Sequence, residues 1–372
     1  MATGAGLEGV VATQSRLCFI DGDAGLLSYQ GFRIETLAEN ATFEETVYLL
    51  WHGRLPKAAE LAELKAALVA NRALPASVEA FLQANPKAAP MHVLRTAVSM
   101  LALDDSDPNN VNVAEAAKKA IRLMAQTATI VTTFDRLRNG KPVVTGDPSL
   151  SFAANFLYTL TGKDQDDVME RVFDIALTLH AEHELNASTF AARVTAATLS
   201  DIYSAVTSAI GALRGPLHGG ANEDVIKLLL KAGNAASALA MVKDMLAKKE
   251  KVPGMGHRVY KTLDPRAISL KGMAEELAKR TGHTELYEAS EQIQKYIKET
   301  KNLNANVDFF SASVYYSLGI PVDLFTPVFA VSRMSGWTAH IMEQYDNNRL
   351  IRPRAEYLGP EVGQAWVAIG DR

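Results

Sequence analysis

The chain has 372 residues, more than a single hydrophobic core usually organises, so we expect two domains. Its 48% hydrophobic and 22% charged residues are typical of a globular protein and exclude a disordered chain. The net charge of −4 provides no general attraction to nucleic acid or to an anionic membrane, so we expect neither as a partner.

The cysteine count and the apolar pattern restrict the chain further. Cys18 is the single cysteine of the sequence, which excludes an internal disulfide and a cysteine-based zinc cluster. No apolar run reaches the length of a membrane span, and the first six residues lack the basic and then apolar pattern of a secretory signal. The sequence therefore predicts a soluble, cytoplasmic protein.

The first predicted element is a small β-hairpin. Residues 16–20 are short and apolar, residues 21–25 provide turn-forming Asp and Gly, and residues 26–29 are apolar again. Thr42 and Glu45 then form a capping-box pattern, which predicts the start of a helix.

From that point the pattern is helical almost throughout. Asn112 is placed to cap a long helix that runs towards Leu137, and a further long helix is expected over residues 188–213. We therefore predict an all-α fold with a small N-terminal β-hairpin. Shorter helices rich in Lys and Glu indicate a smaller domain over residues 220–319, between a large domain of residues 1–219 and a return to it over 320–372.

An acidic segment at residues 104–110 has the oxygen-rich composition of a calcium loop. It lacks the central glycine and the closing glutamate that such a loop needs. We therefore expect a solvated linker between helices.

The segment over residues 251–266 combines glycines, one histidine and several cations. Gly254 and Gly256 allow a ligand to approach the backbone closely, and His257 follows at once. Arg266 begins a predicted helix after Asp264 and a proline. An imidazole beside a guanidinium suits a carboxylated small molecule. The alternative is an ordinary surface loop with solvated basic residues.

Two further segments contain histidines. His180 and His183 share one helix face and could bind a metal, but their spacing is not that of a zinc protease, so a structural or substrate-binding role is favoured. His218 is flanked by glycines, and Asn222 is placed to cap a helix that begins near Asp224. The positive end of that helix would keep His218 a neutral hydrogen-bond donor. The alternative is a histidine held in a tight turn.

Two charged residues lie in apolar surroundings. Asp308 stands between a valine and two phenylalanines, which should raise its proton affinity and make it a better base; alternatively it caps a helix. Arg333 lies in an apolar helix, where it needs an anion, either a ligand or a protein carboxylate.

Together these motifs resemble the citrate synthase family, in its short bacterial and archaeal form, from about residue 9 to the C-terminus. The resemblance is carried by motifs in the right order: Ile20-Asp-Gly, Gly215-Pro-Leu-His-Gly-Gly, Gly254-Met-Gly-His-Arg-Val-Tyr-Lys with Asp264-Pro-Arg, Asn306-Val-Asp and Arg352-Pro-Arg. It implies a nearly all-helical homodimer whose small domain closes over the substrates.

The resemblance also implies a reaction, in which acetyl-CoA is condensed with oxaloacetate to give citrate and CoA. By similarity Asp308 removes the methyl proton, His218 hydrogen-bonds the thioester oxygen, and His257 polarises the oxaloacetate carbonyl. The implied oxaloacetate ligands are His183, Arg266, Arg333, Arg352 from the second subunit and, on a poorer match, Arg72, with Phe329 at the pocket border.

The residues implied to lie along CoA are Lys251, Val252, Pro253, Gly254 and Met255, with Arg258 and Lys261 as further phosphate partners. Acetyl-CoA is a co-substrate, and neither a metal nor a permanently bound cofactor is expected. The family's long bacterial form has an extra N-terminal region linked to NADH inhibition; the chain starts after it, so we expect no such inhibition.

Three alternatives stay open at this stage. A 2-methylcitrate synthase would use propionyl-CoA with the same residues. A metal-dependent hydrolase would use His180, His183 and Glu184. A helical scaffold protein would need none of the three proposed catalytic residues.

Overall fold

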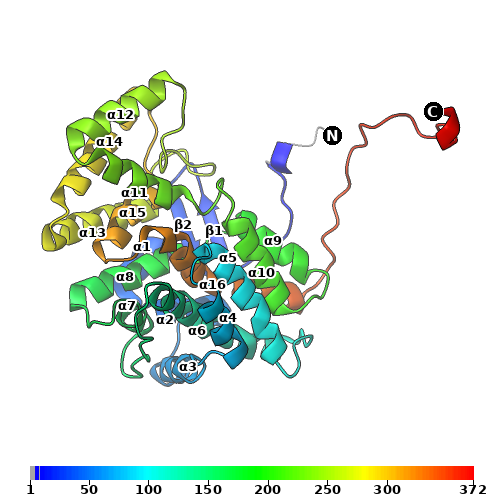
Figure 1. Cartoon of the computed structure of the whole chain (residues 1–372), viewed down its shortest axis with the longest axis horizontal. Coiled ribbons are helices and arrows are strands. Elements are labelled where there is room, and N and C mark those ends of the chain that lie inside the picture. Colours follow the sequence, from blue (N-terminus) through cyan, green and yellow to red (C-terminus); the bar gives the residue numbers. More distant parts are fainter. Residues whose placement is uncertain (1–4, 8) are drawn as a thin grey trace.

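The computed structural model describes residues 5–7 and 9–372, and helices dominate it (Figure 1), which confirms the predicted fold class. The expectation about a secretory signal concerns mainly residues 1–4, which lie outside the described residues. Among the described helices, none combines the length and the apolar character that a bilayer crossing requires.

The predicted hairpin is present. Strands β1 (Cys18–Asp21) and β2 (Leu26–Tyr29) pair antiparallel from Cys18 with Tyr29 to Asp21 with Leu26. A two-residue strand that the sequence analysis missed, β3 (Phe32–Arg33), adds to β2 and completes a three-stranded sheet. The sheet leads directly into the first helix.

The first half of the chain is a series of helices. Their bounds are α1 Ile34–Asn40, α2 Phe43–His52, α3 Ala58–Ala70, α4 Ala76–Ala84, α5 Pro90–Met100, α6 Val113–Arg138, α7 Phe152–Thr161 and α8 Asp167–His180. The capping box of Thr42 and Glu45 is present at α2, and Asn112 caps α6 as predicted. Short 3₁₀ turns occur at Ala5–Leu7, Leu101–Asp104, Val322–Leu324 and Ile369–Asp371.

The helix predicted over residues 188–213 is wrong in one respect, because two helices occupy this stretch. They are α9 (Ala187–Ala196) and α10 (Ile202–Leu213). Leu199 has a positive φ of 61°, which an α-helix cannot accommodate, and the Asp201 side chain accepts the Ser204 N–H at 2.9 Å as a new N-cap. The apolar periodicity continues through the break between α9 and α10, so periodicity alone did not reveal that the helix ends there.

The second half contains α11 Ala221–Ala232, α12 Ala235–Ala247, α13 Pro265–Thr281, α14 Thr284–Lys301, α15 Val307–Ser317 and α16 Phe325–Asp346. Helices α11 to α15 gather on one side of the molecule, while α16 returns to the centre of the other helices (Figure 1). Beyond α16 the chain extends away from the helical body.

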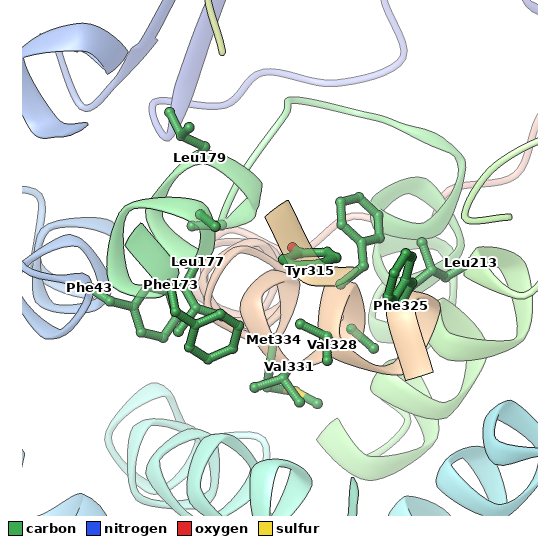
Figure 2. Close-up of a cluster of buried hydrophobic side chains, with 14 of the residues drawn as sticks. Phe43, Phe173, Leu177, Leu179, Leu213, Tyr315, Phe325, Val328, Val331 and Met334 are labelled. Atoms are coloured by element: carbon green, nitrogen blue, oxygen red, sulfur yellow. The ribbon is translucent and has the colours of Figure 1, made fainter. Parts of the chain in front are cut away.

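Helix α16 is the centre of the core. Nearly all of its residues are buried, on every face. Figure 2 shows Val331 and Met334 of this helix beside Phe173 of α8, and Phe325 beside Tyr315 of α15, with ring centroids 5.5 Å apart for the last pair. Polar residues in the middle of this helix, such as Arg333, are therefore buried as well.

The acidic segment at residues 104–110 is a linker, but it is not only solvated. The buried Lys119 ammonium lies beneath it and donates to the carbonyls of Asp107, Pro108 and Asn110 at 2.5, 3.0 and 3.1 Å. The chain thus supplies its own cation to the oxygens of this loop.

Candidate active site

The loop that carries His257 is paired with the segment that enters α15. The Gly256 N–H donates to the Asn304 carbonyl at 2.8 Å, and the Asn306 N–H donates to the Gly254 carbonyl at 3.0 Å. Because the Asn306 side chain also donates to the Gly256 carbonyl at 2.9 Å, the two segments form one rigid unit. His257 and the first turn of α15 are therefore held side by side.

Gly254 is required at this junction. Its φ is 73°, and a Cβ atom there would lie 2.8 Å from a Val225 methyl and 2.9 Å from the Phe309 ring. The glycine noted in the sequence thus allows the loop to pack closely against α11 and α15.

The backbone fixes the tautomer of His257. Its Nδ1 accepts the N–H groups of Val259 at 3.0 Å and Tyr260 at 3.2 Å, so the ring hydrogen must lie on Nε2. Burial, together with the Arg266 charge, lowers the pKa of His257 to about 4. The imidazole is thus a neutral donor through Nε2.

His218 has the opposite tautomer to His257. Its Nε2 accepts the Ser188 N–H at 3.3 Å, with the Ser188 hydroxyl 2.8 Å away, which leaves Nδ1 as the donor. Burial, and then the Arg333 charge, lowers its pKa to about 4. The ring is therefore neutral as predicted, and loss of solvation is the largest cause.

The predicted start of the next helix is wrong. Helix α11 begins at Ala221, because the backbone is already helical at Gly220, which occupies the N-cap position. Asn222 therefore lies within the first turn, buried, with its side-chain oxygen accepting the Glu223 N–H at 2.8 Å. It does not cap the helix.

Asp308 lies in the first turn of α15 but does not cap it. Asn306 is the N-cap and accepts the Asp308 N–H at 3.0 Å, so the capping alternative for Asp308 is wrong. Burial raises the pKa of the Asp308 carboxyl to about 6, against the opposing effect of the Arg266 and Arg333 charges. The group is a base of moderate strength that feels the charges of two guanidinium groups.

Arg266 has a protein partner that the sequence analysis missed. Asp264, noted there only as a residue that precedes the helix, accepts from Nε of Arg266 at 3.0 Å and from its Nη2 at 2.8 Å, and both side chains are buried. The second carboxylate oxygen also accepts the Val307 N–H at 3.1 Å. The bidentate pair leaves the Nη1 side of the guanidinium available.

Arg333 is held differently. Its Nε donates to the His180 carbonyl at 2.6 Å, and its guanidinium lies 4.8 Å from the centre of the Phe329 ring. Among the ion pairs of the described residues, none involves Arg333, although its side chain is 1% exposed. A buried guanidinium of this kind needs an anion.

His183 joins the group from the end of α8. Its Nε2 lies 3.1 Å from the Tyr260 hydroxyl, and its ring centre is 5.3 Å from that of His257. Burial and the Arg266 charge hold its pKa well below the usual value.

His180 points elsewhere. Its Nδ1 donates to the Ala176 carbonyl at 2.7 Å, and its ring packs edge-on against Phe329 at 5.1 Å. The two histidines of the segment therefore have different partners, and no cluster of three metal-binding side chains occurs within residues 5–7 and 9–372. The geometry lends no support to a metal-dependent hydrolase.

The structure does not bring every predicted site residue to this group. Arg352 is exposed, in the segment that leaves the helical body after α16 (Figure 1). Arg72 donates to the Asp147 carbonyl at 3.0 Å and to the Asn155 side chain at 3.1 Å, against α7. Neither contacts the histidines in a single subunit.

The residues expected to lie along CoA differ in exposure. Lys251 and Arg258 are exposed, whereas Val252 and Gly254 are buried. The Lys261 ammonium forms an exposed ion pair of 3.0 Å with Asp23 in the hairpin turn. Pro253 and Met255 are partly exposed on the same loop.

Two further polar residues support the site and carried no motif in the sequence. Ser188, which contacts His218, also accepts from the Trp337 ring nitrogen at 3.1 Å. Glu182 accepts a hydrogen bond from His340 of α16 at 2.9 Å, with both side chains fully buried. Only their position in space reveals them, because 30 or more residues separate the partners in sequence.

The chain is similar to known proteins over almost its whole length. Residues 6–354 match the family model described as "Citrate synthase, C-terminal domain". "Citrate synthase 2" of Bacillus subtilis is 52% identical over 369 residues, which cover 99% of this chain and 98% of the relative. A "2-methylcitrate synthase" of Shewanella oneidensis is 44% identical over 359 residues, covering 96% and 95%.

A solved structure has the same fold. Citrate synthase from Thermoplasma acidophilum, in a ternary complex with carboxymethyl coenzyme A and oxaloacetate, aligns with a TM-score of 0.93 at 34% identity, over 99% of each chain.

Proposed function

The chain belongs to the citrate synthase family, and from its site we propose that it condenses acetyl-CoA with oxaloacetate to give citrate and free CoA. The observation that carries the proposal is Arg333, a buried guanidinium without a carboxylate partner among the described residues, beside neutral histidines that present N–H donors. This arrangement suits a dicarboxylate whose carbonyl is to be attacked.

In the first step Asp308 takes a proton from the acetyl methyl group. That proton is far less acidic than a carboxylic acid, and each unit of pKa mismatch costs about 1.4 kcal/mol, so the enolate must be stabilised as it forms. His218 stabilises it by donating a hydrogen bond from Nδ1 to the thioester oxygen. A donor aimed at a developing oxyanion typically contributes roughly 10²–10³ in rate.

In the second step the enolate carbon attacks the oxaloacetate carbonyl carbon. His257 donates from Nε2 to the carbonyl oxygen, which becomes the alkoxide. Water then cleaves the thioester of the condensed product and releases citrate and CoA. A neutral imidazole is suited to both donor positions, because it can donate a hydrogen bond without placing a positive charge in a buried site.

The substrate carboxylates meet Arg333 and the Nη1 side of Arg266, with His183 as a further hydrogen-bond donor. Phe329 borders the pocket, because its ring lies 4.8 Å from the Arg333 guanidinium and 6.4 Å from the His218 ring. Arg72 is left out of the proposed site because its contacts lie against α7.

The site is completed by a second subunit in a homodimer. Arg352 is exposed on a segment that extends from its own body, and we assign it to the oxaloacetate pocket of the partner subunit. The proposed division keeps residues 220–319 as a small domain that closes over residues 1–219 and 320–372, excluding water during condensation.

CoA lies along the loop of Lys251, Val252, Pro253, Gly254 and Met255, which leads directly to His257. Arg258 and Lys261, both exposed, are the phosphate partners. This places the thioester between His218 and Asp308.

Release of free thiol tests the function directly. Acetyl-CoA and propionyl-CoA are each incubated with the enzyme, with and without oxaloacetate. We expect release that requires oxaloacetate and is faster with acetyl-CoA. Release independent of oxaloacetate contradicts a condensation.

The same assay tests 2-methylcitrate synthesis from propionyl-CoA, the activity named for the Shewanella relative. One methylene changes binding by only about 1–3 kcal/mol, so the same catalytic residues serve either acyl group. A higher kcat/KM for propionyl-CoA would reassign the substrate and leave the mechanism unchanged.

A further inference from the structure

The turn of the N-terminal hairpin packs against the loop that follows His257. The Lys261 N–H donates to the Gly22 carbonyl at 3.0 Å. A Cβ atom at Gly22 would lie 2.2 Å from the Val259 carbonyl oxygen and 2.9 Å from its carbonyl carbon. Since the φ of Gly22 is outside the left-handed region, the close approach is what requires glycine here.

The hairpin is rigid enough to act as a support. In its turn, Asp21 Oδ1 accepts the N–H groups of Asp23 at 3.0 Å and Ala24 at 2.9 Å. At its other end, the buried Tyr29 hydroxyl donates to the Glu182 carbonyl at 2.8 Å, one residue before His183. The hairpin thus spans from the His183 segment to the His257 loop.

The atom that Gly22 accommodates belongs to the peptide group that holds His257. The Val259 carbonyl and the Tyr260 N–H share one planar peptide unit, so a rotation of one moves the other. That N–H is one of the two donors to His257 Nδ1, at 3.2 Å, and the Val259 N–H is the second.

We propose that Gly22 is a positioning residue for His257, because the hairpin turn holds the Val259–Tyr260 peptide in the orientation that directs the imidazole Nε2–H into the pocket. This inference rests on the proposed role of His257 as the donor to the oxaloacetate carbonyl. Gly22 itself contacts neither substrate nor ring.

A side chain at position 22 cannot be accommodated by a small movement of a neighbouring side chain. The neighbour at 2.2 Å is a backbone oxygen, so a methyl group forces the peptide or the whole hairpin turn to shift. At Gly25, which has a φ of 66°, a Cβ atom would instead lie 2.7 Å from the Thr262 methyl, which can move more easily. The two glycines therefore disturb neighbouring parts of one packing surface: Gly22 meets the Val259 carbonyl itself, whereas Gly25 meets Thr262 and the Leu263 carbonyl, with added backbone strain from its positive φ.

The test compares Gly22→Ala and Gly25→Ala with Asp23→Asn. The last variant removes only the exposed ion pair with Lys261, which we expect to contribute little. His257→Gln serves as the reference for loss of the donor. For each, kcat, the KM for both substrates, the melting temperature and the infrared carbonyl stretch of bound oxaloacetate are measured.

We expect Gly22→Ala to lower kcat roughly 10- to 100-fold, since a misplacement of about 1 Å can cost 10²-fold. The carbonyl stretch of bound oxaloacetate should move towards its value in water, while the KM for acetyl-CoA stays within about twofold. Gly25→Ala should show the same pattern to a smaller degree, and it carries the test if Gly22→Ala does not fold.

The outcomes distinguish the positioning role of Gly22 from the proposed function of the enzyme. If His257→Gln lowers kcat but the folded glycine variants keep normal kcat and carbonyl frequency, the positioning role is overturned and the proposed function stands. If His257→Gln itself leaves kcat unchanged, the proposed function fails. A loss of melting temperature without a change in carbonyl frequency indicates a purely structural glycine and likewise overturns the inference.

Discussion

Burial determines the protonation of the acid and the histidines in this site. Loss of solvation favours the neutral form of any ionisable group, so it raises the pKa of Asp308 to about 6 and lowers those of His218 and His257 to about 4. Above pH 6 the carboxylate is therefore ionised while both rings remain neutral. One physical effect thus prepares a base and two donors for the same pH range.

The pH dependence of activity follows from the Asp308 pKa. As pH falls through about 6 the carboxylate takes up a proton and loses its function as a base, so kcat/KM should fall about tenfold per pH unit on the acid side. The histidines, neutral above about 4, contribute no limb in that range. The Asp308→Asn variant should lose this limb together with most of its activity.

The measurement is kcat/KM for acetyl-CoA between about pH 4.5 and 8, the range in which Asp308 is the one group of the proposed catalytic three that titrates. An acid limb near the ordinary aspartate value, about 3.9, would show that burial does not control this group.

We expect Arg333 to contribute to ligand binding and not to the free energy of unfolding. Because no carboxylate of the described residues pairs with it, Arg333→Met should leave the free energy of unfolding of the empty enzyme unchanged or higher. The KM for oxaloacetate should rise roughly 100-fold, since a buried ligand carboxylate loses its partner. Urea unfolding measures the free energy of unfolding, and steady-state kinetics measure the KM for oxaloacetate.

Arg193 is the matched control. It is equally buried but paired with Glu343 at 2.5 Å, so Arg193→Met should lower the free energy of unfolding by about 3–5 kcal/mol. A large loss of stability in Arg333→Met would imply a structural role for that guanidinium instead.

At the scale of elements, the loops of this protein are held by specific side chains that the helices present to them. Lys119 of α6 holds the segment at residues 104–110 through three carbonyl oxygens. The segment that enters α15 is held by Asn306 and Asp264. Polar side chains thereby give both segments a defined conformation.

Replacing Lys119 with methionine should release its loop. The three carbonyls lose their buried partner, and a loss of about 1–3 kcal/mol in the free energy of unfolding is expected, together with faster proteolysis after residue 104. Lys118→Met, which removes an exposed ion pair with Glu115, should change stability by less than about 1 kcal/mol. Equal stability losses in both variants would contradict the structural role of the buried ammonium.

At the scale of the whole molecule, the site is assembled from segments far apart in the sequence, and the proposed function needs one more from another copy. Helix α16 brings Arg333 to the end of α8, and the hairpin reaches the His257 loop. Arg352, by contrast, belongs to the segment after α16, which extends away from the helical body (Figure 1).

Mixing two inactive variants tests the contribution in trans. Asp308→Asn and Arg352→Gln are each expected to lower activity roughly 100-fold or more. A mixed dimer of the two has one intact site, made of Asp308 from one subunit and Arg352 from the other. After unfolding and joint refolding at equal concentration, activity should recover to about a quarter of the wild-type value, because half of the dimers are mixed and each has one working site.

Recovery no greater than the sum of the separate variants would show that both residues act within one subunit. Refolding each variant alone provides that baseline.

Features set by neighbouring residues were predictable from the sequence. The hairpin, the capping box of α2 and the cap of α6 matched, because turn chemistry and capping depend on residues within a few positions. The residue types around His218, His257 and Asp308 likewise indicated the chemistry and the family.

The sequence by itself thus determined the helical fold, its local starts and stops, and the family to which the chain belongs. Only the tertiary structure decided which ring nitrogen of each histidine is free, that burial keeps His218 neutral, and that Arg333, unlike Arg266, pairs with no carboxylate of the described residues. These properties depend on solvent exclusion and on partners distant in the chain, such as Ser188 for His218, and no local pattern encodes them.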